Sequence, residues 1–403
     1  MENIADKILL AREQKDNLIK SYVDVYQVVS LKANIPGSNK NIKEAFLLLN
    51  IFFKKIIKFN PIKTMFFNSM DGPYYLFLFD KNISLKEKMV CIENENELSR
   101  LIDIDVYLDK YHSLNRSRPR KCFICNESAL ICSRMQKHGV SELINHISKI
   151  CENHLRKTIK EMIDESMLVE LNLHPKFGLV TPYSNGSHLD MDYKIMMKAK
   201  DAIVDDLTEM FMLGYQEDLP LDLLFYKARD IGKKADFDMF NATNGINAYQ
   251  GLIFNLGLVL VNFGKVLKDN LSLKDAFINI KKMSKEFIKE GNYGARKQAS
   301  LGYEIIINLF KNHDISKMST MDKLIYFIIN LDDTILLKRC KNEKLIKTIK
   351  EEFKKIDSSN KLLINQMDEM CIKNNLSFGG CADLLVVTIF IEKFSETFNK
   401  IYS

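Results

Sequence analysis

The residues with the clearest chemical potential lie between positions 175 and 192. This stretch places Lys176, His188, Asp190 and Asp192 beside two glycines. A glycine-containing loop lets the backbone approach a phosphate, and a lysine supplies a point charge. On a regular helix the two aspartates would lie about 200° apart, so they can face one ligand only in an extended or turn segment. The stretch therefore predicts a site for a polyphosphate and its metal ion.

A second candidate site lies upstream, where Asp103 and Asp105 are separated by one isoleucine in a strand-like segment. Side chains two residues apart point to the same face of a strand, so these carboxylates would lie side by side. Mg²⁺ prefers a few carboxylates together with substrate phosphates. A solvated strand face is the alternative interpretation. The basic residues nearby, which include Arg12, Lys40 and Arg134, favour the metal site.

Three cysteines and one histidine form a third group, which consists of Cys122, Cys125, Cys132 and His138. Thiolates and an imidazole at such spacings are ligands that zinc takes in structural sites. The alternative is a set of reduced, half-buried thiols. A structural zinc ion would hold the loop behind the aspartate pair and would take no part in the chemical step.

Polar residues recur in the second half of the chain, in loops between helical segments. These loops carry Lys176, Asn185 to Asp192, Asn247, Arg296, Asp333 and Asp383. Each loop by itself is more often a helix cap or a turn. Together they are able to converge at one end of a helical bundle. We therefore expect paired acids that hold Mg²⁺ and a nucleoside triphosphate, with Lys176 and Arg296 in contact with phosphate.

Composition limits the class of protein. The chain has 403 residues, of which 46% are hydrophobic and 27% charged, as is typical of a soluble protein with two domains. Its net charge of +6 is spread over mixed faces, without the footprint of nucleic-acid binding. We find no signal peptide, and the longest apolar stretch, 252–263, is too short to span a bilayer. The scattered cysteines suit a reducing compartment, so we expect a cytoplasmic protein that binds neither nucleic acid nor membrane.

Hydrophobic periodicity divides the chain into two parts, which we predict as domains 1–149 and 150–403. In the first part, the patterns predict helices at 4–20 and 42–57 and strands at 25–35, 74–79, 88–92 and 101–108. This order is typical of an α+β domain with a mainly antiparallel sheet. From about residue 141 onward nearly every apolar pattern has the helical period, which predicts an all-α helical bundle.

Longer motifs carry a resemblance to two enzyme families. The segment 101–106 and the segment from Cys122 to His138 make the first part similar to the apo-citrate lyase phosphoribosyl-dephospho-CoA transferases. The second part resembles the triphosphoribosyl-dephospho-CoA synthases. Its matching motifs are Pro175-Lys176, Asn185-Gly186 with His188 and Asp190-Met191-Asp192, Asp332-Asp333-Thr334, and Gly379-Gly380 with Ala382-Asp383. Together the two resemblances cover almost the whole chain, in the order found in known fusions.

The resemblance implies two steps in the synthesis of a prosthetic group. The synthase would join ATP to 3′-dephospho-CoA, with a ribose hydroxyl displacing adenine. The transferase would move the phosphoribosyl-dephospho-CoA unit to a serine of the citrate lyase acyl carrier subunit, releasing pyrophosphate. The implied catalytic groups are Asp103 and Asp105, which hold Mg²⁺, and Asp190, Asp192 and Asp333. The implied substrate contacts are Arg12, Lys40 and Arg134 in the first domain and Lys176, Asn185, His188, Asn247, Arg296 and Asp383 in the second.

The second part also departs from the family it resembles. Ala248, Tyr249 and Gln250 stand where Thr-His-Lys is usual, and Thr181, Leu189 and Gln298 replace charged residues. One alternative therefore keeps only the first activity and makes the second domain a ligand-binding scaffold without turnover. Another is a non-catalytic adaptor for an acyl carrier protein. The carrier itself would belong to citrate lyase, with malonate decarboxylase as the alternative.

Overall fold

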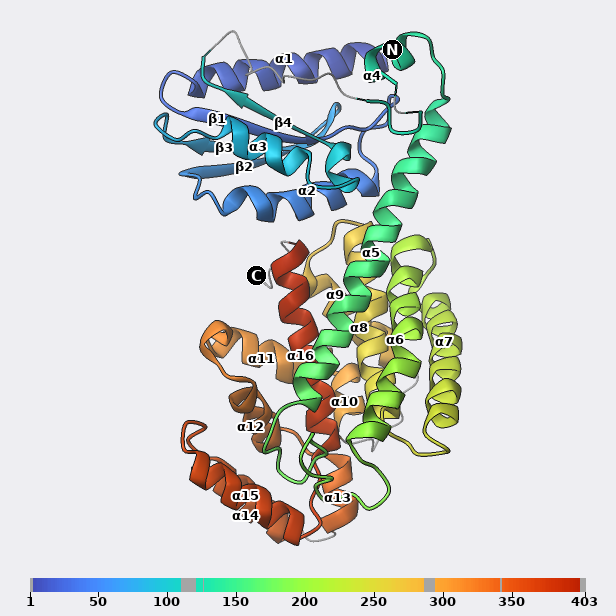
Figure 1. The fold of residues 1–403 in the computed structure, drawn as a ribbon, viewed down its shortest axis with the longest axis vertical. Helices are drawn as coiled ribbons and strands as arrows, with labels where there is room; N and C mark the ends of the chain where they lie inside the picture. The colour runs from blue at the N-terminus through green and yellow to red at the C-terminus, as the bar shows by residue number, and fades with distance from the viewer. Residues whose placement is uncertain (1–2, 110–120, 126, 286–293, 341–342, 399–403) are drawn as a thin grey trace. The chain divides into compact units, whose positions relative to one another are not determined.

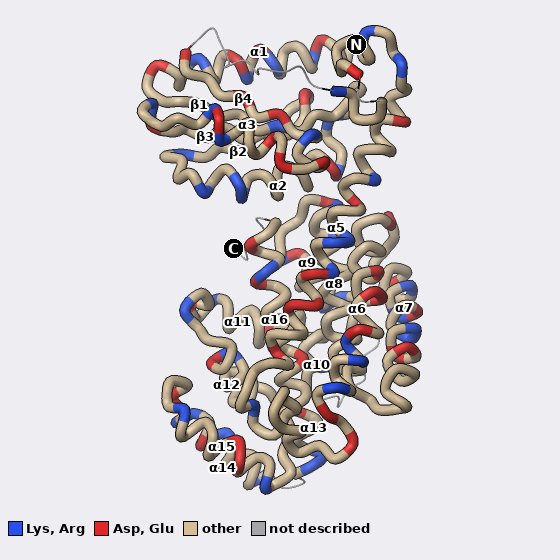
Figure 2. The backbone as a smooth tube through the Cα atoms, viewed as in Figure 1, with Lys and Arg blue, Asp and Glu red and all other residues tan. Residues whose placement is uncertain are grey.

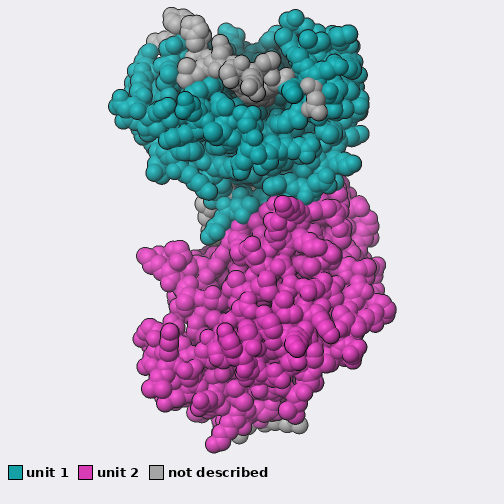
Figure 3. Space-filling view, in the orientation of Figure 1, with its two compact units in different colours: residues 1–155, 267–270, 395–400 teal, residues 156–266, 271–394, 401–403 magenta. Residues whose placement is uncertain are grey.

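The computed structural model describes residues 3–109, 121–125, 127–285, 294–340 and 343–398. It forms two compact units, shown in Figures 1 and 3. The first unit contains residues 1–155, 267–270 and 395–400, and the second contains residues 156–266, 271–394 and 401–403. The first holds a sheet with helices and the second is helical, which confirms the predicted fold classes. The predicted domain boundary after residue 149 stays a prediction.

A four-stranded antiparallel sheet forms the centre of the first unit. Its order is β2 (Lys63–Ser69), β3 (Gly72–Phe79), β1 (Gln27–Ala33) and β4 (Ile102–Tyr107). In β4 the residues Ile102, Ile104 and Val106 are buried, and the aspartates between them are half-buried. The alternation therefore turns both aspartates to one face of the sheet, as their spacing predicts.

Helices cover both faces of this sheet, as Figure 1 shows. Helix α1 (Ile4–Tyr22) lies on the face that carries the aspartates, which we call the α1 face. There Ile19 packs with Val28 and Leu76 of the sheet. On the opposite face Phe53 of α2 (Lys43–Ile57) lies 4.8 Å from the ring of Tyr75, measured between ring centroids.

The sequence misassigned one element and missed another. The strand predicted at 88–92 is wrong, because this segment belongs to helix α3 (Lys86–Glu93). Met89 and Glu93 are buried on one face of it, and the Glu93 carboxylate accepts a hydrogen bond of 2.8 Å from Ile104 N at the edge of the sheet. Strand β2 was missed because it is a largely exposed edge strand without a strong apolar pattern.

The second unit is helical. It begins with the second half of α5 (Val140–Leu171), whose first half belongs to the first unit. The helices that follow are α6 (Tyr193–Gln216), α7 (Leu221–Ala242), α8 (Gln250–Lys268), α9 (Leu273–Lys285), α10 (Ala295–Ser300), α11 (Glu304–Asn312), α12 (Thr320–Asn330), α13 (Thr334–Cys340), α14 (Glu343–Phe353), α15 (Lys361–Lys373) and α16 (Gly379–Phe398). Helices α6 and α8 touch through Gly214 and Gly264, where a Cβ atom would overlap the backbone of the other helix. Phe263 of α8 then packs on Phe394 of α16, with ring centroids 4.8 Å apart.

Helix α8 is long and apolar enough to cross a membrane by length and composition alone. In the fold, 78% of its most apolar window is buried inside the protein, as in the central helix of a helical core. Basic and acidic residues are interspersed along both units (Figure 2). The charge pattern is therefore mixed, as the sequence indicates.

Candidate active sites in the two units

The aspartate pair of β4 lies beside basic residues on the α1 face. In the antiparallel register Lys32 of β1 lies opposite Asp103, and Ser30 lies opposite Asp105. Lys15 of α1 is placed over the ring of Tyr74, with 5.1 Å from its Nζ to the ring centroid. Burial lowers the pKa of Lys15, and the nearby carboxylate of Asp105 opposes that shift. The arrangement can accept a metal ion together with the oxygens of a phosphate chain.

Asp71, in the turn between β2 and β3, forms ion pairs with two basic residues. Its carboxylate pairs with Lys32 and, at 3.0 Å, with Nη2 of Arg12. Burial would raise the pKa of Asp71, but hydrogen bonds from Arg12 and Lys32 hold it below the usual value. Lys40 belongs to the same electrostatic group. Burial lowers its pKa and the charge of Lys32 adds to that shift.

Two of the predicted substrate contacts, Arg12 and Lys40, therefore lie near the α1 face. Arg134 is exposed on helix α4 (Ala129–Arg134), in the segment that carries the cysteine cluster. Sequence reasoning missed Lys32 and Asp71. The available signal was a charged residue, Lys32, in a largely buried strand pattern, and Asp71 directly before a glycine.

A cavity of about 1590 Å³ opens in the first unit, and we call it the unit 1 cavity. It is bounded by the segment after β1, by α3 and by the cysteine-containing segment. Its basic lining residues are Lys40, Lys86, Arg100 and Lys121. The volume is larger than the roughly 300–1,000 Å³ of most small-molecule pockets, so it is large enough for an extended ligand.

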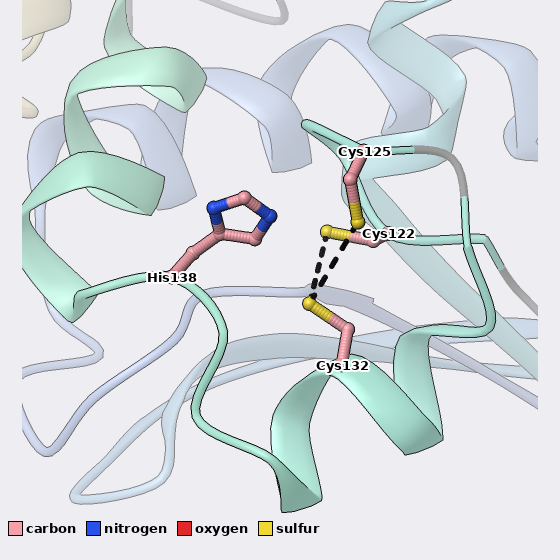
Figure 4. A group of neighbouring side chains, drawn as sticks. All are labelled: Cys122, Cys125, Cys132 and His138. Carbon is pink, nitrogen blue, oxygen red and sulfur yellow. Dashed lines mark hydrogen bonds between the residues drawn. The ribbon is translucent and has the colours of Figure 1, made fainter.

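The four predicted zinc ligands lie together (Figure 4), and three of them, Cys122, Cys132 and His138, line this cavity. The ligand atoms of Cys122, Cys125, Cys132 and His138 all lie within 4.8 Å of one another. The Sγ atom of Cys132 lies 3.5 Å from that of Cys122 and 4.0 Å from that of Cys125. His138 Nε2 is buried without a hydrogen-bond partner among the described residues, while Nδ1 lies 3.3 Å from Glu142 Oε1. The cluster has the composition and size of a metal site.

A smaller cavity, which we call the unit 2 cavity, lies where the loops of the second unit converge. Its volume is about 220 Å³. The polar lining residues are Glu170, Lys176, His188, Asn247, Tyr249, Gln250, Ser377 and Asp383. They come from the end of α5, the loop before α6, the start of α8 and the start of α16. The segments of Lys176, His188 and Asn247 therefore converge at this cavity, as expected. Asp383 also lines it, but this residue lies in the first turns of α16 and not in a loop as predicted.

Lys176 and Glu170 form a buried ion pair in the wall of the unit 2 cavity. The Nζ atom lies 2.8 Å from Glu170 Oε1 and donates to the Glu170 carbonyl oxygen at 3.0 Å. The two side chains are only 2% and 4% exposed. The charge of Lys176 is therefore already balanced by protein groups.

Asp383 is the second carboxylate in this wall. Burial raises its pKa well above the usual value, the charges of Asp333 and Glu170 add to the shift, and Arg296 opposes it. The carboxylate lies against Gly251, where any Cβ atom would overlap Asp383 Oδ2. Asp383 is thus a carboxyl group that binds a proton strongly at a cavity wall.

Two of the predicted catalytic aspartates, Asp192 and Asp333, lie at helix starts and accept backbone hydrogen bonds. Asp192 caps α6 by accepting from Ile195 N at 2.8 Å. Asp333 accepts from Ile335 N at 2.7 Å and from Cys381 N at 3.0 Å. These contacts position the loops that line the unit 2 cavity. Asp190 is exposed in the loop before α6.

His188 links three segments through its ring. Nε2 lies 3.0 Å from Ser377 Oγ, and Nδ1 lies 3.2 Å from Nη2 of Arg339. Burial and the Arg339 charge lower the pKa of His188 to about 4. Because a guanidinium only donates, Nδ1 accepts and Nε2 carries the proton of a neutral ring.

The other predicted substrate contacts are more peripheral. Asn247 is exposed and caps α8 by accepting from Gln250 N at 3.2 Å. Asn185 is exposed in the loop before α6. Arg296 is exposed, with its guanidinium 5.4 Å from the ring centroid of Phe254. Glu170 and Tyr249 line the cavity and were missed as site residues. The available signal for Glu170 was an acidic residue among apolar residues near the end of α5.

Comparison with known proteins matches two family models to the chain. The model described as apo-citrate lyase phosphoribosyl-dephospho-CoA transferase matches residues 4–154. The model described as ATP:dephospho-CoA triphosphoribosyl transferase matches residues 156–288 and 278–401. The matches adjoin each other between residues 154 and 156, close to the limit between the two units.

Individual relatives match over nearly the full length. Protein CitXG of Leuconostoc mesenteroides subsp. cremoris is 30% identical, over 95% of this chain and 94% of the relative. Protein CitXG of Haemophilus influenzae is 28% identical over 88% of this chain and 85% of its own. The 2-(5″-triphosphoribosyl)-3′-dephosphocoenzyme-A synthase of Haemophilus ducreyi is 28% identical over 66% of this chain and 98% of its own.

We predict that the free energy of unfolding of the second unit falls as the pH is lowered from about 6.5 toward about 4. In this range His188 binds a proton in the unfolded chain but not in the folded protein, so protonation favours unfolding. Chemical denaturation at about pH 7.5 and about pH 5 measures the loss. The variant His188→Gln should lose less stability over the same interval. An equal loss in both proteins would contradict the role of His188.

Proposed function

The chain belongs to the CitXG family, in which the two activities of citrate lyase maturation are fused, and we propose how its two units divide them. The protein is a transferase that synthesises the citrate lyase prosthetic group and transfers it, and it is not a non-catalytic adaptor. We assign synthesis to the second unit and transfer to the first. The substrates we propose are ATP, 3′-dephospho-CoA and the acyl carrier subunit of citrate lyase.

The first unit transfers the phosphoribosyl-dephospho-CoA group at the α1 face. The serine oxygen of the carrier forms a bond to the α-phosphorus, and the bond from that phosphorus to the bridging oxygen breaks. Pyrophosphate leaves, and the serine proton is released to solvent. Asp103 and Asp105 would hold Mg²⁺, which offsets the developing negative charge. Arg12, Lys32 and Lys40 are placed to contact the phosphate chain, and Asp71 orients the first two.

The second unit joins the two nucleotides at the unit 2 cavity. A ribose hydroxyl oxygen of dephospho-CoA bonds to C1 of the ATP ribose, the glycosidic bond breaks, and the hydroxyl proton leaves finally on adenine. Asp383 is the carboxylate best placed to accept that proton, because it lines the cavity and its raised pKa makes the ionised carboxylate a stronger base. At about 220 Å³ the cavity encloses only part of a nucleotide, so the triphosphate extends toward the exposed Asp190 and Arg296.

The cysteine cluster holds a structural zinc ion in this proposal. Zinc binds each thiolate at about 2.3 Å, which spaces the sulfurs of a tetrahedral site by about 3.8 Å. Two observed separations, 3.5 and 4.0 Å, lie on either side of that value. Burial would raise the pKa of Cys122, but backbone hydrogen bonds from Cys125 and Ile124 lower it to about 7, which favours the thiolate, whereas burial raises the pKa of Cys132. The unbonded Nε2 of His138 supplies the fourth ligand.

A cytoplasmic location fits these assignments. All eight cysteines are free thiols in the structure, and ATP is a cytoplasmic substrate. The apolar helix α8 serves as a core helix of the second unit.

For the first unit, we predict that Asp103→Asn lowers transfer about 100- to 1,000-fold, because an amide no longer offsets the charge of the metal ion. The assay supplies ready-made triphosphoribosyl-dephospho-CoA and the apo carrier subunit, and it follows the mass increase of the carrier. Asp6→Asn, an exposed position on α1, serves as the control and should transfer normally. Normal transfer by Asp103→Asn would remove the metal assignment.

For the second unit, we predict that the protein releases adenine from ATP and dephospho-CoA in the presence of Mg²⁺. Asp383→Asn should slow this release about 100- to 10,000-fold, the usual contribution of a general base. Chromatographic detection of free adenine measures it, with Asp205→Asn, a 73% exposed side chain on α6, as the control. Absence of adenine with the unmodified protein would instead favour a ligand-binding scaffold with transfer as its only activity.

For the cysteine cluster, we predict about one zinc ion per chain in protein purified under reducing conditions. Cys122→Ser should lose the metal, because it removes a thiolate ligand. Cys91→Ser removes an exposed thiol outside the cluster and should keep it. Elemental analysis measures the zinc content per chain. Protein that stays metal-free after incubation with zinc would contradict the site.

A further inference from the structure

Tyr249 carries an unused hydrogen-bonding group beside the unit 2 cavity. Its side chain is 3% exposed and lines the cavity. The hydroxyl oxygen is buried and has no hydrogen-bond partner among the residues that the structure describes. The backbone is held in place, because Tyr249 N donates to Met239 Sδ at 3.1 Å. Buried hydroxyl groups are nearly always hydrogen-bonded, so this one is set up for a partner from outside the protein.

The surroundings of this hydroxyl define the partner. Burial raises the pKa of Tyr249 well above the usual value, and the charges of Glu170 and Asp383 add to the shift. The phenol therefore keeps its proton and can both donate and accept. Lys176 is the only lysine or arginine in the described lining of the cavity, and its ammonium is bound to Glu170.

A phosphate group fits this cavity poorly. Its negative charge would find no uncommitted cation in the described lining, because Lys176 is already bound to Glu170. A ribose hydroxyl fits well, because it donates to a carboxylate and also exchanges a hydrogen bond with a phenol. The cavity volume of about 220 Å³ likewise suits the sugar and not an extended triphosphate.

We propose that Tyr249 and Asp383 form a ribose-hydroxyl subsite in the second unit, with Tyr249 as a positioning residue that selects ribonucleotides over deoxyribonucleotides. The subsite deepens the function proposed for this unit and rests on it. Tyr249 stands where related synthases usually carry histidine, so the phenol supplies the donor and acceptor that the imidazole would offer. The hydroxyl comes either from ATP or from dephospho-CoA, and the substrates used in the test distinguish the two.

The test compares Tyr249→Phe with the unmodified protein on natural and deoxy substrates. Removing the hydroxyl should lower kcat/KM for adenine release about 10- to 100-fold, mainly by raising KM for the nucleotide that is bound. With 2′-deoxy-ATP, 3′-deoxy-ATP and 3′-deoxy-dephospho-CoA, the analogue that lacks the bound hydroxyl should show no further loss in Tyr249→Phe. Tyr249→His should recover part of the activity. Tyr226→Phe, 49% exposed on α7, is the matched control.

Direct binding separates this proposal from the proposed catalysis. Calorimetric titration of each ribonucleotide and its deoxy analogue measures the preference even if no adenine is released. The unmodified protein should prefer one ribonucleotide about 10- to 100-fold, and Tyr249→Phe should lose that preference. Equal discrimination by both proteins against every analogue would overturn the subsite.

Discussion

The cavity of the second unit depends on the burial of one ion pair, between Glu170 and Lys176. A charge that is removed from water is stable only beside an opposite charge. Removing one partner of such a buried pair generally lowers the free energy of unfolding by about 3–5 kcal/mol. The Lys176 ammonium also binds the Glu170 carbonyl oxygen, so the pair fastens the loop before α6 to the last turn of α5. Gly178 N then donates to Asp368 Oδ1 at 2.9 Å, which ties the same loop to α15.

This constraint determines the chemistry left to the other groups. Lys176 is bound to Glu170, so no other lysine or arginine of the described cavity lining is left for Asp383. Burial and the charge of Asp333 then raise the pKa of Asp383. A buried carboxyl group without a counter-charge is costly for stability and useful as a base. The first unit shows the opposite arrangement. There Asp71 is surrounded by Arg12 and Lys32, so its pKa is lowered and it orients basic groups without taking up protons.

The sequence predicted the framework well and individual roles less well. Alternation in β4 placed Asp103 and Asp105 on one face, because period two is a local property of a strand. The cysteine spacing likewise predicted the cluster that the fold assembles. Sequence alone did not separate a helix cap from a cavity carboxylate. Asp192 and Asp383 are both aspartates in glycine-containing loop motifs, yet one accepts a hydrogen bond from backbone N–H and the other meets a cavity.

The same distinction changes how the departures of the second unit are weighed. Thr181 is buried in a tight turn, where its hydroxyl accepts from Tyr183 N at 3.2 Å and Ser184 N at 3.1 Å, as a carboxylate would. Leu189 is fully exposed and lines neither described cavity. The changes at the cavity are those at 248–250, and among them Tyr249 replaces one hydrogen-bonding ring by another. The number of departures therefore overstates the loss of chemistry, because three of the six preserve a backbone contact, face solvent or keep a donor and acceptor at the same wall.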